Sequence, residues 1–522
     1  MENRGRRNTS LVLRVIMVVM AATALGITVR FLIFWQVKRT LLAKIETLAL
    51  DGVQIRYVSL DINSWKGSLR ITGVDVRQDS LCRSSAAVER IHLEGIHILP
   101  ALFQRKLVID SVSVFRPSAH YVQIPSETSQ DEVERGFLHE VEIRVMYIDS
   151  GMMEVRNESC MPSLSTNLNM TLRNLRVVNL DTDSLTWDVA HVGARQVRIN
   201  LPEKFYAINI DKINYSGNDQ SLRLDSVELS STLGRLEFAQ QSHHQIDQIN
   251  GRIPSLTISG LEFGDSEHPF IKARRVALQF KIDVFRDRRF PKATRDPSVL
   301  PIKFMRELPF SLHIDSILIV QSFVSYKEVP ERGGVPGEIF FDELTAGIYD
   351  VSTDSVGETV MMVNSRFMDS GELNARFTFP QDGRTPSTVT ASLAHFAMPD
   401  INLMLLPIAN MEISTGEMQS LKFQFQYDEH EATGDLELRY TDLKLLSIRT
   451  NEQRSTNKFA TFLINTMVQN SMDKQDPKYK RSGSIRWKRN SQVGVLSYWW
   501  KSILAGLKSV FRLDRILGLY EE

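Results

Sequence analysis

Apolar and polar residues alternate along much of the chain. Clear runs occur at residues 141–147, 373–379 and 421–427, where every second side chain is apolar. Such alternation is typical of a strand with one dry face and one wet face, as in antiparallel sheets. Residues 435–440 form another such run, so the sequence predicts a hairpin with 428–434 as its loop. We therefore expect a mainly β protein with a largely antiparallel sheet.

Several apolar runs change phase at an Asp-Ser step, as at Asp110-Ser111, Asp225-Ser226 and Asp315-Ser316. A one-residue shift turns all later side chains to the other face unless a bulge absorbs it. We therefore expect bulges or turns at these steps. The Asp-Ser-apolar form is also similar to an acceptor motif of periplasmic O-glycosylation in some Gram-negative bacteria, and bulge formation is the simpler interpretation.

The N-terminal region predicts a membrane anchor. Residues 11–35 are almost wholly apolar apart from Arg14 and Arg30, whose side chains can reach the head groups. Arg4, Arg6 and Arg7 precede this run and favour a cytoplasmic N-terminus. A cleaved signal peptide is the alternative. An uncleaved anchor is favoured, because the apolar run continues to residue 35, past the small residues at 21–24.

Short helices are predicted at residues 37–50, 399–410 and 457–473, and a longer amphipathic one at 495–519. In the last helix the apolar side is predicted to contain Leu496, Trp499, Trp500, Ile503, Leu507, Val510 and Phe511. This helix could pack on the sheet as a lid. It could also lie at a membrane surface, with interface candidates Trp499, Trp500, Lys501, Lys508 and Arg512.

Composition narrows the class of protein. The 522 residues include 62 Lys and Arg and 62 Asp and Glu, so the formal net charge is zero and nothing favours nucleic acid as a partner. A hydrophobic content of 43% is that of a folded protein. The two cysteines, Cys82 and Cys160, exclude a disulfide scaffold and leave one disulfide open.

No motif predicts catalysis, a metal or a cofactor. Residues 263–266 (Phe-Gly-Asp-Ser) resemble the nucleophile block of GDSL-type esterases, but they lie in the middle of a β-rich chain and no histidine follows His430. His243 and His244 are adjacent, so on a strand they would point to opposite faces and not share a metal ion. We expect a protein that is not an enzyme.

The layout resembles the AsmA-like envelope proteins of Gram-negative bacteria, in which an N-terminal anchor leads into a β-rich domain. The likeness is carried by residues 88–117 (apolar-x-Leu-x-Gly-Ile-x-Ile-x-Pro-x-Leu, then Leu-x-Ile-Asp-Ser-Val-x-Val-x-x-Pro) and by 413–416, 421–427 and 434–444. The resemblance implies an inner-membrane protein with an elongated, curved sheet that forms an apolar groove. It also implies a role in phospholipid movement between membranes or in outer-membrane integrity.

These inferences give one predicted organisation: a cytoplasmic N-terminus (1–9), a transmembrane helix (10–35), a short helix or linker (36–50), an AsmA-like β-rich domain (51–330), its continuation with short helices (331–490) and a C-terminal amphipathic helix (491–522). The expected role is cell-envelope lipid homeostasis, with phospholipid as partner and the bulk of the chain in the periplasm. The groove candidates are Leu421, Phe423, Phe425, Tyr427, Leu436 and Leu438.

Two other functions remain open at this point. The domain could be a scaffold that binds other envelope proteins, in which case the apolar face would be an ordinary packed core. It could also be a membrane-anchored periplasmic hydrolase, which would require polar residues that converge in a pocket.

Overall fold

A computed structural model describes residues 53–63, 66–78, 84–122, 139–156, 162–178, 186–201, 205–264, 269–292, 298–353, 356–447, 482–492 and 494–510. Strands contain 69% of these residues and helices 13%, which confirms the mainly β class. The predicted transmembrane helix, the helices at 37–50 and 457–473, and both cysteines lie outside the described residues. Within the described ranges, no helix is both long enough and apolar enough to span a membrane.

The chain divides into two compact units, residues 1–204 and 205–522. The sequence had suggested a division near residue 330, which falls directly after a strand of the second unit.

The first unit is a sheet of bent strands. Its elements are β1 (Val53–Arg56), β2 (Ser59–Asn63), β3 (Ser68–Gln78), β4 (Ser85–His97), α2 (Ile98–Gln104), β5 (Lys106–Val122), β6 (Glu140–Arg156), β7 (Pro162–Val178) and β8 (Thr186–Leu201). β1 and β2 pair with different halves of β3, and β3 to β8 then pair in sequence order. All these pairs are antiparallel except β5 with β6, which are parallel.

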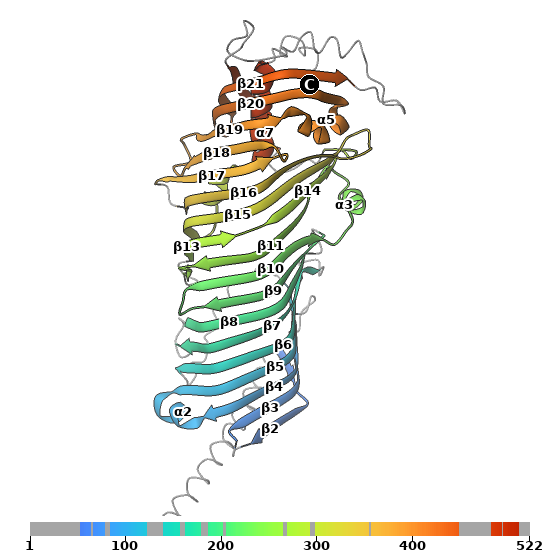
Figure 1. Ribbon diagram of the computed structural model, residues 1–522. Helices are drawn as coiled ribbons and strands as arrows, with labels where there is room; N and C mark the ends of the chain where they lie inside the picture. The colour runs from blue at the N-terminus through green and yellow to red at the C-terminus, as the bar shows by residue number, and fades with distance from the viewer. Residues whose placement is uncertain are drawn as a thin grey trace, which may run out of the picture. The chain divides into compact units, whose positions relative to one another are not determined.

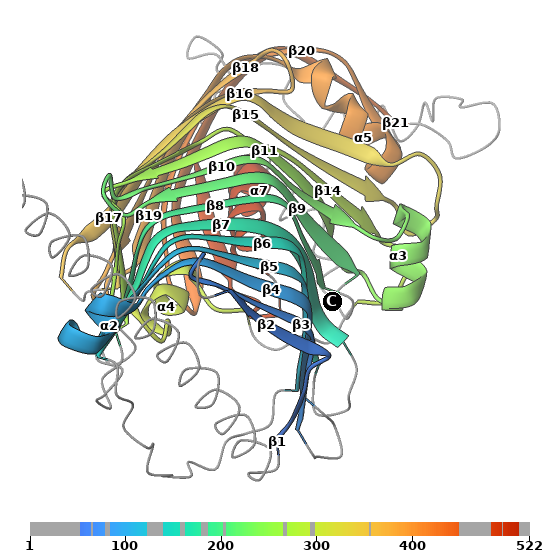
Figure 2. The same ribbon diagram turned by 90° about the horizontal axis from the view of Figure 1, so that it is seen from below.

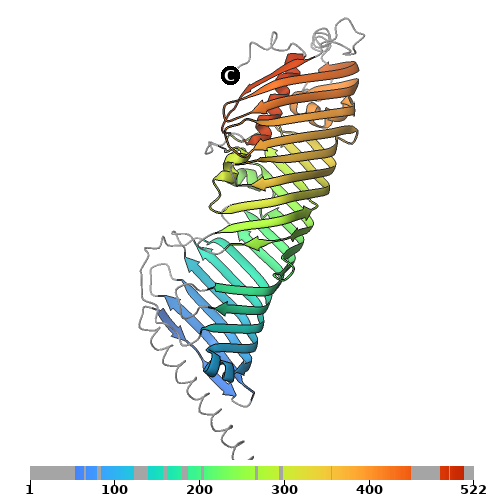
Figure 3. The ribbon, with the colours of Figure 1, turned by 90° about the vertical axis from the view of Figure 1, so that its left-hand side faces the viewer.

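The second unit is also built from a sheet in which most neighbouring strands are antiparallel. Its strands are β9 (Tyr206–Ser216), β10 (Ser221–Ser231), β11 (Gln248–Ser259), β12 (Glu262–Phe263), β13 (Phe270–Leu278), β14 (Lys281–Asp287), β15 (Ser311–Val329), β16 (Gly337–Ser352), β17 (Glu358–Phe367), β18 (Gly371–Pro380), β19 (Ser387–Ala397), β20 (Met411–Tyr427), β21 (Glu431–Ser447) and β22 (Gly483–Lys488). β13 and β14 both lie between β11 and β15 and run parallel to β15. From β15 to β22 each strand pairs antiparallel with the next (Figures 1 and 3).

The helices of the second unit are short except for the last. They are α3 (Arg235–Ser242), α4 (Pro301–Arg306), the 3₁₀ helix η2 (Met398–Ile401), α5 (Asn402–Ala409) and α7 (Val495–Val510). η2 and α5 confirm the helix predicted at 399–410. The hairpin predicted around 428–434 is confirmed with a tighter turn, because the Asp428 carboxylate accepts hydrogen bonds from the backbone N–H groups of His430 and Glu431 at 2.7 and 2.9 Å.

Left-handed residues inside the strands bend the sheet. In the first unit, Gly73, Arg116, Ser150 and Gln196 have φ values of 62, 46, 54 and 53° and lie in one row across β3, β5, β6 and β8. The second unit has Ser226, Gln321 and Glu343 at φ values of 51, 43 and 49°. A left-handed residue within a strand bends it and increases its local twist. Figure 2 shows the resulting arched strands.

The Asp-Ser steps coincide with such bends. Ser226 is itself left-handed. Asp110 lies opposite Gly95, and Asp315 lies opposite Asp350, and these two partners have φ values of 67 and 56°. The predicted phase shifts are therefore absorbed either by the Asp-Ser strand or by its neighbour.

Candidate functional site

Two rows of apolar side chains run along one face of the second unit, one residue per strand. The first row contains Tyr215, Leu222, Ile258, Val276, Ile317, Ile348, Met361, Phe377, Val389 and Phe425. The second contains Ile213, Leu224, Leu256, Leu278, Ile319, Ala346, Val363, Ala375, Ala391, Phe423 and Leu436. We call them the apolar rows. They exist because pairing register places every second residue of each strand on the same face.

The apolar rows change from half-buried to buried along the unit. From β9 to β18, the residues of the first row are half-buried. At β19 and β20 the exposed fractions of Val389 and Phe425 fall to 2% and 1%. The rows therefore have an open part and a covered part.

Helix α7 covers the second part. Tyr498 meets the Tyr427 ring edge-on at 5.8 Å, and Trp499 lies 4.8 Å from the Phe377 ring. Ser502 and Gly506 are buried one and two turns further on. Figure 2 shows α7 on the concave side of the arched strands, so the apolar rows lie on that side.

All the groove candidates from the sequence lie in this covered part. Leu421, Phe423, Phe425, Tyr427, Leu436 and Leu438 belong to one hydrophobic core, with exposed fractions of 7, 9, 1, 2, 1 and 1%. They are on the expected apolar face, and α7 contacts Tyr427 and approaches Leu436 directly. The open part of the same face, on β9 to β17, was not singled out from the sequence, although the same alternation marks it.

The side of α7 that contacts the sheet agrees in part with the predicted apolar side, because Trp499, Ile503, Leu507 and Val510 pack against the core. Phe511 lies outside the described residues. Leu496 and Trp500 are exposed by 73% and 48%, while the small residues Ser502 and Gly506 are buried. An added Cβ on Gly506 would lie 2.8 Å from the side chain of Ile485 on β22. The helix docks through small residues because these let its backbone approach the sheet closely, a preference that hydrophobicity alone does not reveal. Among the interface candidates, Trp499 packs on the sheet, Lys501 is half-buried, Lys508 is exposed and Arg512 lies outside the described residues.

The first unit carries two apolar rows of its own. One contains Leu69, Leu93, Val112, Met146, Leu172 and Val192, and the other Ile71, Ile91, Val114, Ile148, Met170 and Ala194. Most of these side chains are half-buried. Both units therefore present a lengthwise apolar stripe.

A charged network lies on β14 and β15, two neighbouring strands of the open part. On β14, Ile282, Val284 and Arg286 alternate onto the apolar side, and Arg286 pairs with Asp247 through two hydrogen bonds of 2.6 and 2.7 Å. The Tyr326 hydroxyl donates to Glu328 at 2.6 Å. Burial raises the pKa of Tyr326 far above its usual range, so this hydroxyl keeps its proton. The network is ion-paired and supplies no evident nucleophile.

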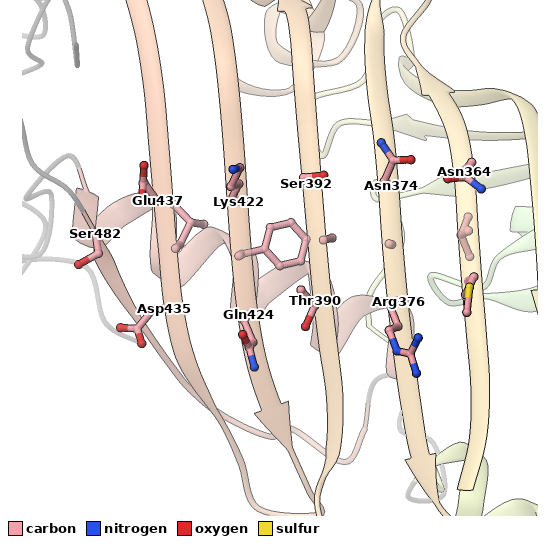
Figure 4. Close-up of a pocket in the computed structure, with 16 residues that line it drawn as sticks. Asn364, Asn374, Arg376, Thr390, Ser392, Lys422, Gln424, Asp435, Glu437 and Ser482 are labelled. Carbon is pink, nitrogen blue, oxygen red and sulfur yellow. The ribbon is translucent and has the colours of Figure 1, made fainter. Parts of the chain in front are cut away.

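A shallow depression of about 700 Å³ with a mixed polar and apolar lining lies on β17 to β21 (Figure 4). Its polar lining includes Asn374, Arg376, Lys422, Gln424, Asp435 and Glu437. Cations and carboxylates are mixed there.

The other residues that the sequence suggested for catalysis or metal binding do not form a common site within the described part of the chain. His243 ends α3, and the His244 ring is hydrogen-bonded to the Ser242 carbonyl at 3.1 Å. Asp265 and Ser266 of the esterase-like block lie outside the described residues. Across the described ranges, no three His, Cys, Asp or Glu side chains are grouped to hold a metal.

No protein-family model matches the sequence, and no curated protein is similar to it.

Proposed function

We propose that the protein holds phospholipid acyl chains on the open part of its apolar rows, as an inner-membrane-anchored periplasmic protein in cell-envelope lipid homeostasis. The observation that carries the proposal is the contrast along one face. The same two rows are sealed at β19 to β21, whereas from β9 to β17 all their residues except the buried Ala346 are half-buried.

Physical chemistry supports an apolar chain as occupant. Each CH₂ group removed from water contributes about 0.8 kcal/mol, so a long acyl chain gains from a long stripe. The rows run across the strands, so they present apolar side chains at each strand spacing of about 4.8 Å. An extended acyl chain matches this linear geometry better than a compact ligand does.

The test is a charged substitution on the open part. Ile317→Asp should strongly reduce the phospholipid that co-purifies with the full-length protein in detergent, measured by mass spectrometry of extracted lipid. The fold should survive because Ile317 is half-buried and its new carboxylate can reach water.

Val320→Asp is the matched control, because Val320 lies on the same strand, points to the opposite face and is 52% exposed. It should leave the lipid content unchanged. Wild-type protein without bound lipid, or equal lipid in both variants, would contradict the proposal.

Membrane topology is tested separately. Reporter fusions after Leu102 and Gly434 should both behave as exported, since Arg4, Arg6 and Arg7 favour a cytoplasmic N-terminus. Cytoplasmic reporter activity at either point would overturn the periplasmic placement.

A further inference from the structure

The apolar rows do not end where α7 begins to cover them. In the first row, Phe377 on β18 is followed by Val389 on β19 and Phe425 on β20, each paired directly with the next. In the second row, Phe423 on β20 is followed by Leu436 on β21. The covered part therefore offers the same kind of apolar surface as the open part, and only its cover differs.

The docked helix takes space that a ligand of the rows would use. The ring centre of Trp499 lies 4.8 Å from that of Phe377 on β18 and 5.9 Å from that of Tyr427 on β20. Gly483 is the second-row position on β22, and an added Cβ there would lie 2.6 Å from the carbonyl oxygen of Gly506. The backbone of α7 thus stands where other strands carry a row side chain, so α7 and a ligand cannot occupy this part of the rows together.

The docked position of α7 also has a cost. The Tyr427 hydroxyl and the Trp499 N–H are both buried, and neither makes a hydrogen bond of normal geometry to any described residue. Burial raises the pKa of Tyr427 to about 12, and the nearby Trp499 N–H and Ser387 hydroxyl offset this only in part. Burying a polar group without a partner is unfavourable. The contact between Gly483 and Gly506 is close but buries little apolar area, so both features make the release of α7 easier.

The chain before α7 is fixed and is then interrupted by a glycine. The Ser298 N–H donates a hydrogen bond to the Ser491 carbonyl at 2.7 Å, and Arg489 forms an ion pair with Glu429. Gly494 follows; it is exposed, and an added Cβ there would have no atom within 4 Å. Hinges consist of a few residues at the ends of elements. Gly494 is therefore placed to let α7 move while β22 stays paired with β21.

We propose that α7 is a lid over a second acyl-chain site, formed by the apolar rows on β19 to β21, and that it moves about Gly494 when the chain of a phospholipid enters. This inference rests on the proposed function and extends the path of the chain. From β18 to β21 there are three strand spacings, about 14 Å, which is shorter than a typical phospholipid acyl chain. A chain held on the last open strands can therefore compete with Trp499 for Phe377 and Tyr427, and it favours the open lid because it binds only there.

The experiment locks α7 in place without touching the rows. Ser484 on β22 and Ser509 on α7 have hydroxyl oxygens 3.4 Å apart, so cysteines at these positions lie within reach of a disulfide. Ser484→Cys/Ser509→Cys is made in full-length protein that also carries Cys82→Ser and Cys160→Ser, so that no other thiol competes. Mass spectrometry verifies that the disulfide has formed.

The probe is phosphatidylglycerol with a photoactivatable diazirine near the methyl end of one acyl chain, added to delipidated protein in detergent. Labelled peptides are identified by mass spectrometry. The reduced double variant should be labelled on the open strands β15 to β17 and also on β20 and β21. The oxidised form should keep the labelling of the open strands and lose most of that on β20 and β21.

Two controls separate the lock from the substitutions themselves. Ser484→Cys alone, in the same background, cannot lock α7, and its β20 and β21 should be labelled equally under oxidising and reducing conditions. Dithiothreitol should restore the labelling of β20 and β21 in the oxidised double variant.

The outcomes separate the two proposals. If no strand is labelled, the proposed function fails and the lid fails with it. If the reduced protein is labelled on the open strands but not on β20 and β21, α7 is a fixed part of the core and only the lid is overturned. Equal labelling of β20 and β21 with and without the disulfide also overturns the lid, because lipid would then reach these strands past a docked α7.

Discussion

Two features of position 95 favour glycine: a left-handed backbone conformation and a close neighbour where a Cβ would lie. Its φ is 67°, and an added Cβ would lie 2.0 Å from the Asp110 carboxylate on the neighbouring strand. Left-handed geometry is costly for residues with a Cβ, and here the side chain would also displace Asp110. Asp110 in turn binds Arg144 at 2.7 Å. One backbone position thus supports both the bend and a polar contact across the strands.

Gly95→Ala should lower the free energy of unfolding by about 1–3 kcal/mol. Gly193→Ala is the matched change in the same unit, because its nearest neighbour to an added Cβ is 3.6 Å away. We expect it to alter stability by less than about 0.5 kcal/mol. Urea unfolding followed by circular dichroism measures both, and equal midpoints for the two variants would contradict the argument.

A substitution at Phe425 tests whether the covered part of the apolar rows is a packed core. It is 1% exposed and packs between Phe423 and Tyr427. Phe425→Ala should therefore cost about 3–5 kcal/mol, as for other buried aromatic residues. Thermal melting should show a large loss for this variant and a small one for Ile317→Ala in the open part. Similar losses would mean that both parts are equally packed.

Phe423 and Phe425 also show what sequence can and cannot predict at this scale. Their alternation with Lys422 and Gln424 correctly predicted an apolar face. It could not predict that this stretch is covered, because the cover is α7, some 70 residues later in the chain. The contact of α7 depends on Ser502 and Gly506, which carry little hydrophobic signal.

At the scale of elements, Glu140 ties three strands together. Its carboxylate binds Arg176 of β7 at 2.6 Å and Lys106 of β5 at 3.0 Å. The hydrogen bond from Arg176 is the main cause that holds the pKa of Glu140 below its usual value. The parallel pair β5–β6 is therefore joined by charge as well as by backbone pairing.

The lowered pKa predicts the direction of a pH effect. A carboxylate with a depressed folded-state pKa stabilises the protein above its unfolded-state pKa of about 4.3, and the contribution is lost as pH falls through the folded value. Glu140→Gln should lower the melting temperature at pH 7 and reduce its further fall below about pH 4.5. Glu89→Gln, which breaks an exposed pair with Arg116, should change little. Parallel pH profiles for wild type and Glu140→Gln would contradict this.

Helix α7 depends on close backbone approach. Gly506→Leu would place a side chain against Ile485 and Leu436, where even a Cβ has neighbours at 2.8 and 3.0 Å. We expect α7 to detach, with faster proteolysis within it and loss of near-ultraviolet circular dichroism from Trp499. Ala505→Leu, one position away and only half-buried, should keep both properties. Unchanged protection in Gly506→Leu would show that α7 docks differently.

At the scale of the whole molecule, the alternation of single strands predicted the class and the predominance of antiparallel pairing. The two parallel steps, β5–β6 and β13/β14–β15, were not predicted. Strand direction depends on where the connecting segment returns, and alternation within a strand contains no such information. The boundary at residue 204 was hidden for a related reason, because strand patterns continue on both sides of it.

The rows of left-handed residues have a consequence for how such a protein can change in length. Curvature is set separately in individual strands, and within the described residues the antiparallel strands from β16 to β21 each pair only with their two neighbours. A duplicated hairpin that carried its bend at the same position would add one module without altering the cross-section of the others. The length of the sheet and the width of its concave side can therefore change independently. Proteins of this architecture could become longer by whole hairpins during evolution while the width available to a ligand stays constant.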